Sequence, residues 1–333
     1  MSRSLPSDCR LPSDFKPVIA WRRRRFPIDW AEEFEASGGL HLEIGFGDGR
    51  FTVRRALENP GERYVGLEIS STSLQRAWRR LRRQQVENVR LLKAGARFAL
   101  RNLFAPGSLT SITVNFPDPW PKGRHAKHRL LQRNFFELAA ARLAPAGHIF
   151  LATDHPNYLE FACSEASTAG YHSRVVEPPA AVLETKYALK WRSKGKPLYF
   201  QLFTYQGGVP LPQDILERPT VMPHSLLVGS LPDGIFMTKK VEAFADGHVI
   251  LHEVARSLRS PEAPRRWLVR VTVEEPDLRQ QLLVAIQDRG DDIIVRFESF
   301  GDPIITGTAR GAIHAVTEWL VSLPGMRVSE RNY

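Results

Sequence analysis

The chain has 333 residues, 43% hydrophobic and 25% charged, which are the proportions of a soluble globular protein long enough for two domains. It holds no apolar run of about 18 residues, so no membrane-spanning helix is expected, and its first residues lack the apolar core of a signal peptide. Cys9 and Cys163 are the only cysteines, too few for a disulfide framework and wrongly spaced for zinc. We therefore expect a cytoplasmic protein that binds neither a membrane nor a metal.

The charge is unevenly distributed along the chain. The whole chain carries 46 Lys and Arg against 36 Asp and Glu, whereas residues 210–333 carry 14 basic and 17 acidic residues. The basic excess therefore belongs to residues 1–209. Clustered Lys and Arg gain from neutralising phosphates and releasing counterions, so we expect a polyanionic partner there. A solvated basic surface without such a role is the alternative.

Residues 1–37 are expected to form a basic N-terminal segment with a short amphipathic helix at 29–36. From residue 38 to 208, apolar runs alternate with helical patterns, which predicts a doubly wound α/β fold with a parallel sheet. Residues 185–206 are expected to close the sheet as an edge hairpin. The expected strands are 40–46, 64–70, 89–94, 111–116 and 147–153, and the expected helices are 49–58, 72–85, 130–143 and 158–169.

A shift in composition at residues 209–223 predicts a linker. Residues 224–333 are expected to form a smaller α+β domain of unknown role, in which Lys239, Lys240, Arg265 and Arg266 are candidates for local nucleic-acid contacts. Its expected strands are 236–244, 248–258, 267–275 and 293–300, and helical spacing predicts helices at 277–287 and 311–323.

Glycines follow the first expected strand with the spacing G-x-G-x-G, at Gly45, Gly47 and Gly49. Glycine permits positive φ and close approach of a ligand to the backbone, at the strand end where open α/β sheets bind ligands. Glu43 would repel a pyrophosphate but suits a cationic, amino-bearing ligand, and Glu68 is placed to accept hydrogen bonds from two ribose hydroxyls. These features favour S-adenosylmethionine over NAD as the cofactor. A tight turn with an incidental Glu is the alternative.

The stretch NFPDPWPK, residues 115–122, places three prolines around Asp118 and Trp120, directly after an expected strand. Prolines fix φ and remove backbone donors, so this loop ends the strand and holds both side chains on a stiff segment. Basic clusters with a neighbouring tryptophan lie at residues 21–26, 76–83 and 122–129, where phosphate contacts could combine with base stacking. The third cluster follows the stiff loop, which favours a nucleic acid over a small metabolite as the substrate.

The motifs LEIGFGDG, VGLEIS, NFPDPWPKGRHAKHR, LATDH and ETKYALKW, in that order within residues 22–206, resemble those of the bacterial tRNA (guanine-N7)-methyltransferases. The resemblance implies a class I methyltransferase (Rossmann-like) fold that transfers the methyl group of S-adenosylmethionine to N7 of guanosine 46 in the tRNA variable loop. It implies tRNA as the partner. Whether the protein is a monomer or a homodimer stays open. By motif, the cofactor-binding residues would be Glu43, Gly45, Gly47, Glu68 and Asp118, with Asp118 also at the reacting centre, and the substrate-binding residues Lys122, Asp154, Thr185, Lys186 and Tyr187.

Two positions depart from the family pattern. Gly95 stands where the family usually has an acid or amide that holds the adenine amino group, so backbone groups would have to serve. Ala188 stands where the substrate motif normally ends in Glu, which leaves Asp154 or Glu184 as candidates for pairing with the guanine edge.

Guanine N7 carries an in-plane lone pair and needs no deprotonation, so the chemistry does not ask Asp118 to be a base. Its expected role is to place the ring or to stabilise the positive charge that develops on it. Two other functions stay open. Asn115-Phe-Pro is similar to the Asn-Pro-Pro-aromatic loop of amino-group methyltransferases acting on nucleic acids, and the departures at Gly95 and Ala188 allow a catalytically inactive RNA-binding protein.

Overall fold

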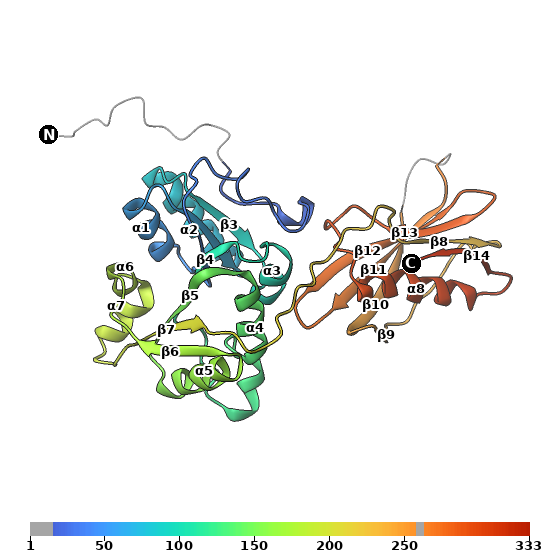
Figure 1. Ribbon diagram of the computed structural model, residues 1–333. Helices are drawn as coiled ribbons and strands as arrows, with labels where there is room; N and C mark the ends of the chain where they lie inside the picture. The colour runs from blue at the N-terminus through green and yellow to red at the C-terminus, as the bar shows by residue number, and fades with distance from the viewer. Residues whose placement is uncertain (1–15, 258–262) are drawn as a thin grey trace, which may run out of the picture. The chain divides into compact units, whose positions relative to one another are not determined.

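The computed structural model describes residues 16–257 and 263–333 and divides the chain into two compact units, Met1–Ile215 and Leu216–Tyr333 (Figure 1). The division falls within residues 209–223, the segment expected to be a linker. Cys9 and the first part of the expected N-terminal segment lie outside the described residues. Each unit contains one seven-stranded sheet.

The sheet of the first unit has the strand order β3-β2-β1-β4-β5-β7-β6. The first five strands in this order pair in parallel, and β7 pairs antiparallel with both β5 and β6. With the helices that connect the strands, this arrangement confirms the doubly wound α/β class. The strands are β1 Leu40–Ile44, β2 Arg63–Glu68, β3 Val89–Lys93, β4 Leu109–Asn115, β5 Leu143–Thr153, β6 Tyr171–Val175 and β7 Tyr199–Tyr205, and the helices are α1 Arg50–Glu58, α2 Ser71–Gln84, α3 Ala96–Asn102, α4 Arg133–Arg142, α5 Pro156–Thr168, α6 Ala180–Leu183 and α7 Lys186–Arg192.

The two faces of this sheet differ in chemistry. Leu40, Leu42 and Ile44 of β1 point to one face and are buried, as expected for a strand in a covered sheet. The opposite face carries a polar row, because His41 lies beside Ser111 of β4, which lies beside His148 of β5. A cavity of about 510 Å³ lies over this face and is lined by the polar row together with Phe150 of β5, Arg174 of β6 and Leu202 of β7.

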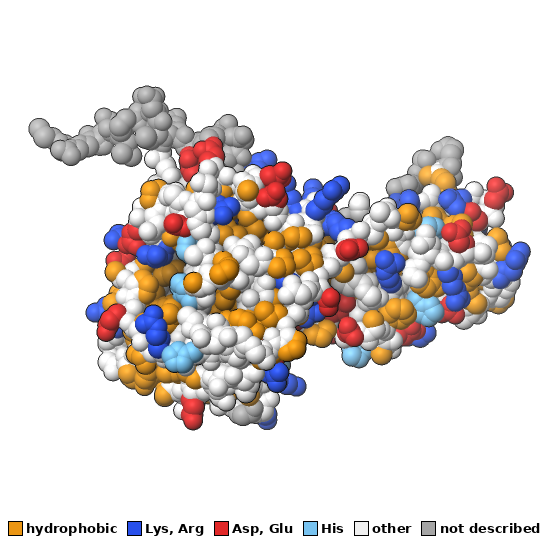
Figure 2. Space-filling model, viewed as in Figure 1, with side chains coloured by type: hydrophobic (Ala, Val, Ile, Leu, Met, Phe, Trp, Pro, Cys, Tyr) orange, Lys and Arg blue, Asp and Glu red, His pale blue; other side chains and the backbone are white. Residues whose placement is uncertain are grey.

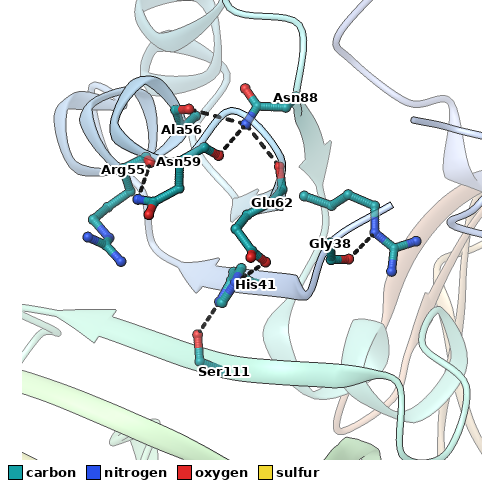
Figure 3. A network of polar contacts seen from close by, with 9 residues as sticks. Gly38, His41, Arg55, Ala56, Asn59, Glu62, Asn88 and Ser111 are labelled. Carbon is teal, nitrogen blue, oxygen red and sulfur yellow. Dashed lines mark hydrogen bonds and ion pairs between the residues drawn. The ribbon is translucent and has the colours of Figure 1, made fainter. Parts of the chain in front are cut away.

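Figure 3 shows the polar contacts around His41 of β1 and around Asn88, which precedes β3. The two ring nitrogens of His41 hydrogen-bond to Ser111 Oγ at 2.8 Å and to Glu62 Oε2 at 3.1 Å. The side-chain amide of Asn88 donates to the carbonyls of Ala56, Asn59 and Glu62 at 2.9 to 3.2 Å. These bonds tie the end of α1 to the starts of β2 and β3 and satisfy carbonyls that the helix leaves unpaired.

Two expectations for the first unit are wrong. Residues 29–36 form turns and no helix; there Trp30 stacks on Phe104 with ring centroids 5.2 Å apart and donates to the Leu103 carbonyl. Residues 186–192 form α7, whose first turn is capped by Thr185, so no hairpin forms there; the antiparallel edge of the sheet consists of β6 and β7, which α6 and α7 separate in the chain. Helix α3 was not expected from the sequence.

The second unit is an antiparallel sheet with the order β14-β8-β13-β12-β11-β10-β9 and one long helix, which confirms the α+β class. Side chains of α8 and of one sheet face form its core, including Trp267, Val269 and Val284. Figure 1 shows α8 lying along the sheet. The elements are β8 His224–Val228, β9 Lys240–Phe244, β10 Gly247–Arg256, β11 Arg266–Glu274, β12 Arg279–Asp288, β13 Ile293–Phe297, α8 Gly307–Val321 and β14 Arg327–Asn332.

The helix expected at residues 277–287 is wrong, because these residues form β12. Its buried residues Gln280, Leu282, Val284 and Ile286 recur with period two, but Leu283 and Ala285 between them make the run continuously apolar. A short continuous apolar run does not distinguish a strand from a helix. Strands β8 and β14 were also missed. Across residues 16–257 and 263–333, no helix is long and apolar enough to cross a membrane.

Gly49 provides a test of how the first unit holds its glycine loop. Its φ is +76°, and a Cβ at this position would lie 2.7 Å from the Ala77 Cβ of α2. Gly49→Ala should therefore lower the free energy of unfolding of this unit by about 2 kcal/mol, through strain and overpacking. Denaturant titration followed by circular dichroism measures the change. Gly61→Ala is the matched control, since a Cβ at Gly61 meets no atom within 4 Å. Equal stability of the two variants would contradict this account.

Candidate active site

The glycine loop leaves β1 at the carboxyl edge of the sheet. Gly45 and Gly47 have φ of +76° and +57°, in the region that favours glycine. A Cβ at either residue would meet no atom of the other described residues within 4 Å, apart from its chain neighbours, unlike one at Gly49. Backbone groups of Gly45 and Gly47 therefore border open space, into which a bound molecule can approach closely.

Glu68 is the last residue of β2 and lies against this loop. Its carboxylate accepts hydrogen bonds from the backbone N–H groups of Gly47 at 3.1 Å, Ile69 at 2.8 Å and Ser70 at 3.0 Å. The carboxylate thus joins the glycine loop to the N-terminus of α2. Ile69 is 73% exposed directly beside it, and the sequence analysis did not single it out. The sequence signal for Ile69 is its position, because it is an apolar residue directly after the acid that ends a strand.

Glu43 lies deeper than Glu68. It is 5% exposed, and its carboxylate accepts hydrogen bonds from the Thr52 hydroxyl and, at 2.9 Å, from the side-chain amide of Asn115. Desolvation by burial raises the pKa of Glu43 from 4.5 to about 7, although these hydrogen bonds act in the opposite direction. Glu43 therefore joins the end of β1 to the end of β4, and its contact with an amino-bearing ligand stays a prediction.

The NFPDPWPK loop begins where β4 ends and has a strained backbone. Phe116 and Trp120 have φ of +52° and +43°, which non-glycine residues rarely adopt. Asp118 lies between them and is exposed. The indole of Trp120, 38% exposed, lies 5.8 Å from the ring of His125 and 5.1 Å from that of His128. The loop therefore presents a carboxylate and a partly covered aromatic face at the edge of the sheet.

The expected substrate residues lie at the end of β5 and in α7. Asp154 follows β5 and pairs with Lys196, whose Nζ is 3.5 Å from its carboxylate. Tyr187 is 47% exposed, with the Lys186 ammonium 6.0 Å from its ring centroid. The ring of Tyr187 lies 6.4 Å from that of Phe116, which places α7 beside the NFPDPWPK loop.

Two residues of the ETKYALKW motif have structural roles here. Thr185 is buried and caps α7: its hydroxyl accepts a hydrogen bond from the Ala188 N–H at 3.3 Å and donates to the Val182 carbonyl at 2.7 Å. Ala188 is completely buried, so the position where the family motif has Glu faces the interior of this protein. A substrate contact of Thr185 stays a prediction. Lys122, the last of the expected substrate residues, is exposed at the end of the NFPDPWPK loop.

The three basic clusters are not equivalent. The expected stacking role of Trp21 is wrong, because its ring is buried and its indole N–H donates to the Lys93 carbonyl at 2.8 Å. In α2, Arg80 donates to the Asp48 carbonyl at 3.1 Å and thereby supports the glycine loop, while Arg79 and Arg83 are exposed. Figure 2 shows Lys and Arg side chains scattered among apolar and acidic ones on the visible face of both units.

Three of the four basic candidates of the second unit, Lys240, Arg265 and Arg266, form ion pairs within it. Arg265 forms ion pairs with Asp288 at 2.7 Å and Asp233 at 3.3 Å, and Arg266 pairs with Glu298. These partners reduce the positive charge available to a nucleic acid. Among the residues that the structure describes, no group of three or more His, Cys, Asp and Glu side chains is arranged to hold a metal ion.

The sequence of this chain is similar to those of known proteins. Residues 37–201 match a family model described as "Putative methyltransferase". A tRNA (guanine-N(7)-)-methyltransferase of Thermus thermophilus is 40% identical over 304 residues, which cover 91% of this chain and 96% of that protein. One of Deinococcus radiodurans is 41% identical over 322 residues, covering 93% and 98%. One of Geobacter metallireducens is 36% identical over 181 residues, covering 52% of this chain and 85% of that protein. The first two alignments extend into the second unit.

The buried carboxyl of Glu43 predicts a pH dependence of stability. Because its pKa is about 7 in the folded state and near 4.5 when unfolded, the unfolded chain ionises first and stability falls as the pH rises from about 4.5 to about 7. Glu43→Gln keeps an acceptor oxygen and does not titrate. As the pH rises through that interval, the free energy of unfolding of this variant should increase by about 3 kcal/mol relative to wild type. Above the interval the difference between the two proteins should stay constant.

Thermal unfolding at several pH values measures this gain. Glu58→Gln is the control, since Glu58 pairs with Arg54 at the surface. Parallel pH curves for wild type and Glu43→Gln would contradict the raised pKa.

Proposed function

The chain belongs to the tRNA (guanine-N(7)-)-methyltransferase family, and on this premise we propose that it methylates N7 of guanosine 46 in the tRNA variable loop with S-adenosylmethionine as the donor. The observation that carries the proposal is the meeting of three features at one edge of the sheet. These are the open glycine loop, the carboxylate of Glu68 and the stiff loop that bears Asp118.

The residues present fit S-adenosylmethionine, which supplies a methyl group carried on a positively charged sulfur. Gly45 and Gly47 leave room for close approach of the cofactor to the backbone. Ile69 offers an exposed apolar side chain for the adenine ring. Glu68 would accept hydrogen bonds from the ribose hydroxyls. A carboxylate has about four acceptor positions and Glu68 uses three of them, so binding two hydroxyls requires at least one backbone N–H to be released.

The protein's part in the reaction is placement and electrostatics. Guanine N7 attacks through its own lone pair, so no side chain has to remove a proton. Asp118 stands on a loop without hinge freedom and would stabilise the positive charge that passes to the guanine ring, or accept hydrogen bonds from the edge of the ring. Alignment of N7 with the methyl carbon supplies the rest of the rate acceleration.

Aromatic and basic side chains around this edge suit an unstacked nucleotide of an RNA. Trp120 in the loop and Tyr187 in α7 are partly exposed, and Lys122 and Lys186, which are close to them in sequence, are exposed. Extruding a base costs a few kcal/mol, which stacking on aromatic rings and contacts to phosphates can offset. Asp154 and Glu184 are the proposed acceptors for the guanine edge.

The direct test is methyl transfer from labelled S-adenosylmethionine to unmodified tRNA transcripts. We expect incorporation into a transcript with guanosine at nucleotide 46, none into the same transcript with adenosine there, and chain cleavage at that nucleotide after reduction and aniline treatment, which is specific for N7-methylguanosine. Asp118→Ala should be folded and inactive, which excludes a contaminating enzyme. Label found as N6-methyladenosine would instead support an amino-group methyltransferase, and binding of tRNA without any transfer would support an inactive RNA-binding protein.

Glu68→Ala should weaken cofactor binding, because it removes the acceptor for the ribose hydroxyls. We expect about a tenfold or greater increase in the Kd for S-adenosylmethionine by calorimetry, equal to about 1.4 kcal/mol or more. Glu68→Gln should retain part of the affinity, since its amide oxygen still accepts. Arg83→Ala, an exposed change in α2, is the control. Unchanged affinity of Glu68→Ala would remove this residue from the cofactor site.

A further inference from the structure

The basic run of residues 122–129 is divided between the surface and the interior. Lys122, Arg124 and Lys127 are exposed, as phosphate-binding side chains would be. Arg129, the last residue of the run, is only 8% exposed. A buried arginine is costly unless its donors are bonded, so its partners indicate what it does.

Those partners are backbone carbonyls of the NFPDPWPK loop. Arg129 Nε donates to the Pro119 carbonyl at 3.0 Å, and Nη2 donates to the Trp120 carbonyl at 3.3 Å. The guanidinium carbon lies 4.6 Å from the ring centroid of Phe161 and 5.8 Å from that of Tyr158, both in α5. One rigid, planar group therefore joins two consecutive carbonyls of the loop to a helix beneath it.

The loop needs such support. Phe116 and Trp120 on either side of Asp118 have positive φ, and strained residues persist only where the surrounding structure fixes them. The Arg129 carbonyl is held in turn by the side-chain amide of Gln132 at 2.7 Å, at the start of α4. The support thus runs from α4 and α5 through Arg129 to the residue that follows Asp118.

We propose that Arg129 is a positioning residue that fixes the Pro119–Trp120 backbone and thereby sets the placement of Asp118 and Trp120, while the remainder of the basic run contacts RNA. The kinetic test of this inference rests on the proposed function, because it measures methyl transfer to tRNA. Lysine cannot replace it, because a single ammonium lacks the planar fork that spans two carbonyls.

Kinetics with tRNA separate positioning from phosphate binding. Arg129→Lys and Arg129→Met should lower kcat about 10- to 100-fold, since a displacement near 1 Å is enough for a 100-fold loss. The tRNA KM and its dependence on salt should stay near wild type. Arg124→Met is the matched comparison: it should raise KM and reduce the salt slope by about 1, as loss of a phosphate contact does, with kcat unchanged. Arg133→Met, exposed on α4, is the neutral control.

A second measurement does not require activity. Hydrogen exchange of backbone amides in residues 116–128 should be faster in Arg129→Met than in wild type or Arg133→Met, with circular dichroism showing a folded chain. Guanidinium ion at millimolar concentration should partly restore the kcat of Arg129→Gly, and it should not change the kcat of Arg124→Gly.

Two results would overturn the inference: wild-type kcat and exchange in Arg129→Lys, or a defect confined to KM and salt slope, which would make Arg129 a phosphate contact. If wild-type protein fails to methylate tRNA but exchange rises only in Arg129→Met, the proposed function fails and the positioning role stands.

Discussion

The buried carboxylate of Glu43 holds together the ends of the two central strands from which both halves of the site depart. Two residues after Glu43 the glycine loop begins, and directly after its partner Asn115 the chain turns into the proline-rich part of the NFPDPWPK loop. A bond of 2.9 Å between these two side chains therefore fixes the separation of the two loops at their roots. The pKa of Glu43 is raised because burial disfavours the charged carboxylate more strongly than the hydrogen bonds from Thr52 and Asn115 favour it.

Beyond this junction, each loop has its own support. Arg80 of α2 and the carboxylate of Glu68 hold the glycine loop through backbone groups. Arg129 holds the proline-rich loop in the same way. In both cases a charged side chain bonds to backbone groups of the loop, and Arg80 adds one bond to the side-chain carboxylate of Asp48. The side chains that face outward, such as Asp118 and Ile69, are left available for binding and chemistry.

The sequence predicted which residues lie at the ligand-binding edge of the sheet. It did not predict which of their side chains are buried and which are exposed. Strand-ending acids and glycines follow from period and spacing, so Glu43, Gly45, Gly47 and Glu68 could be assigned to one edge of the sheet in advance. Residue type alone does not separate Arg129 from Arg124, because the burial of Arg129 depends on Phe161 and Tyr158 of α5, which contact it only in the folded protein. The same limit applies to Trp21 and to β12, where contacts distant in sequence decide the outcome.

The closeness of Gly49 to Ala77 limits how the glycine loop can change over evolutionary time. The backbone of α2 passes so close to the loop that the two positions share one small volume. Enlargement of either residue is then acceptable only after the helix has moved, and moving α2 would also shift Arg80 and the bonds it makes to Asp48. Neutral drift at residue 77 should accordingly be confined to the smallest side chains, although Ala77 is buried and lies outside the loop itself.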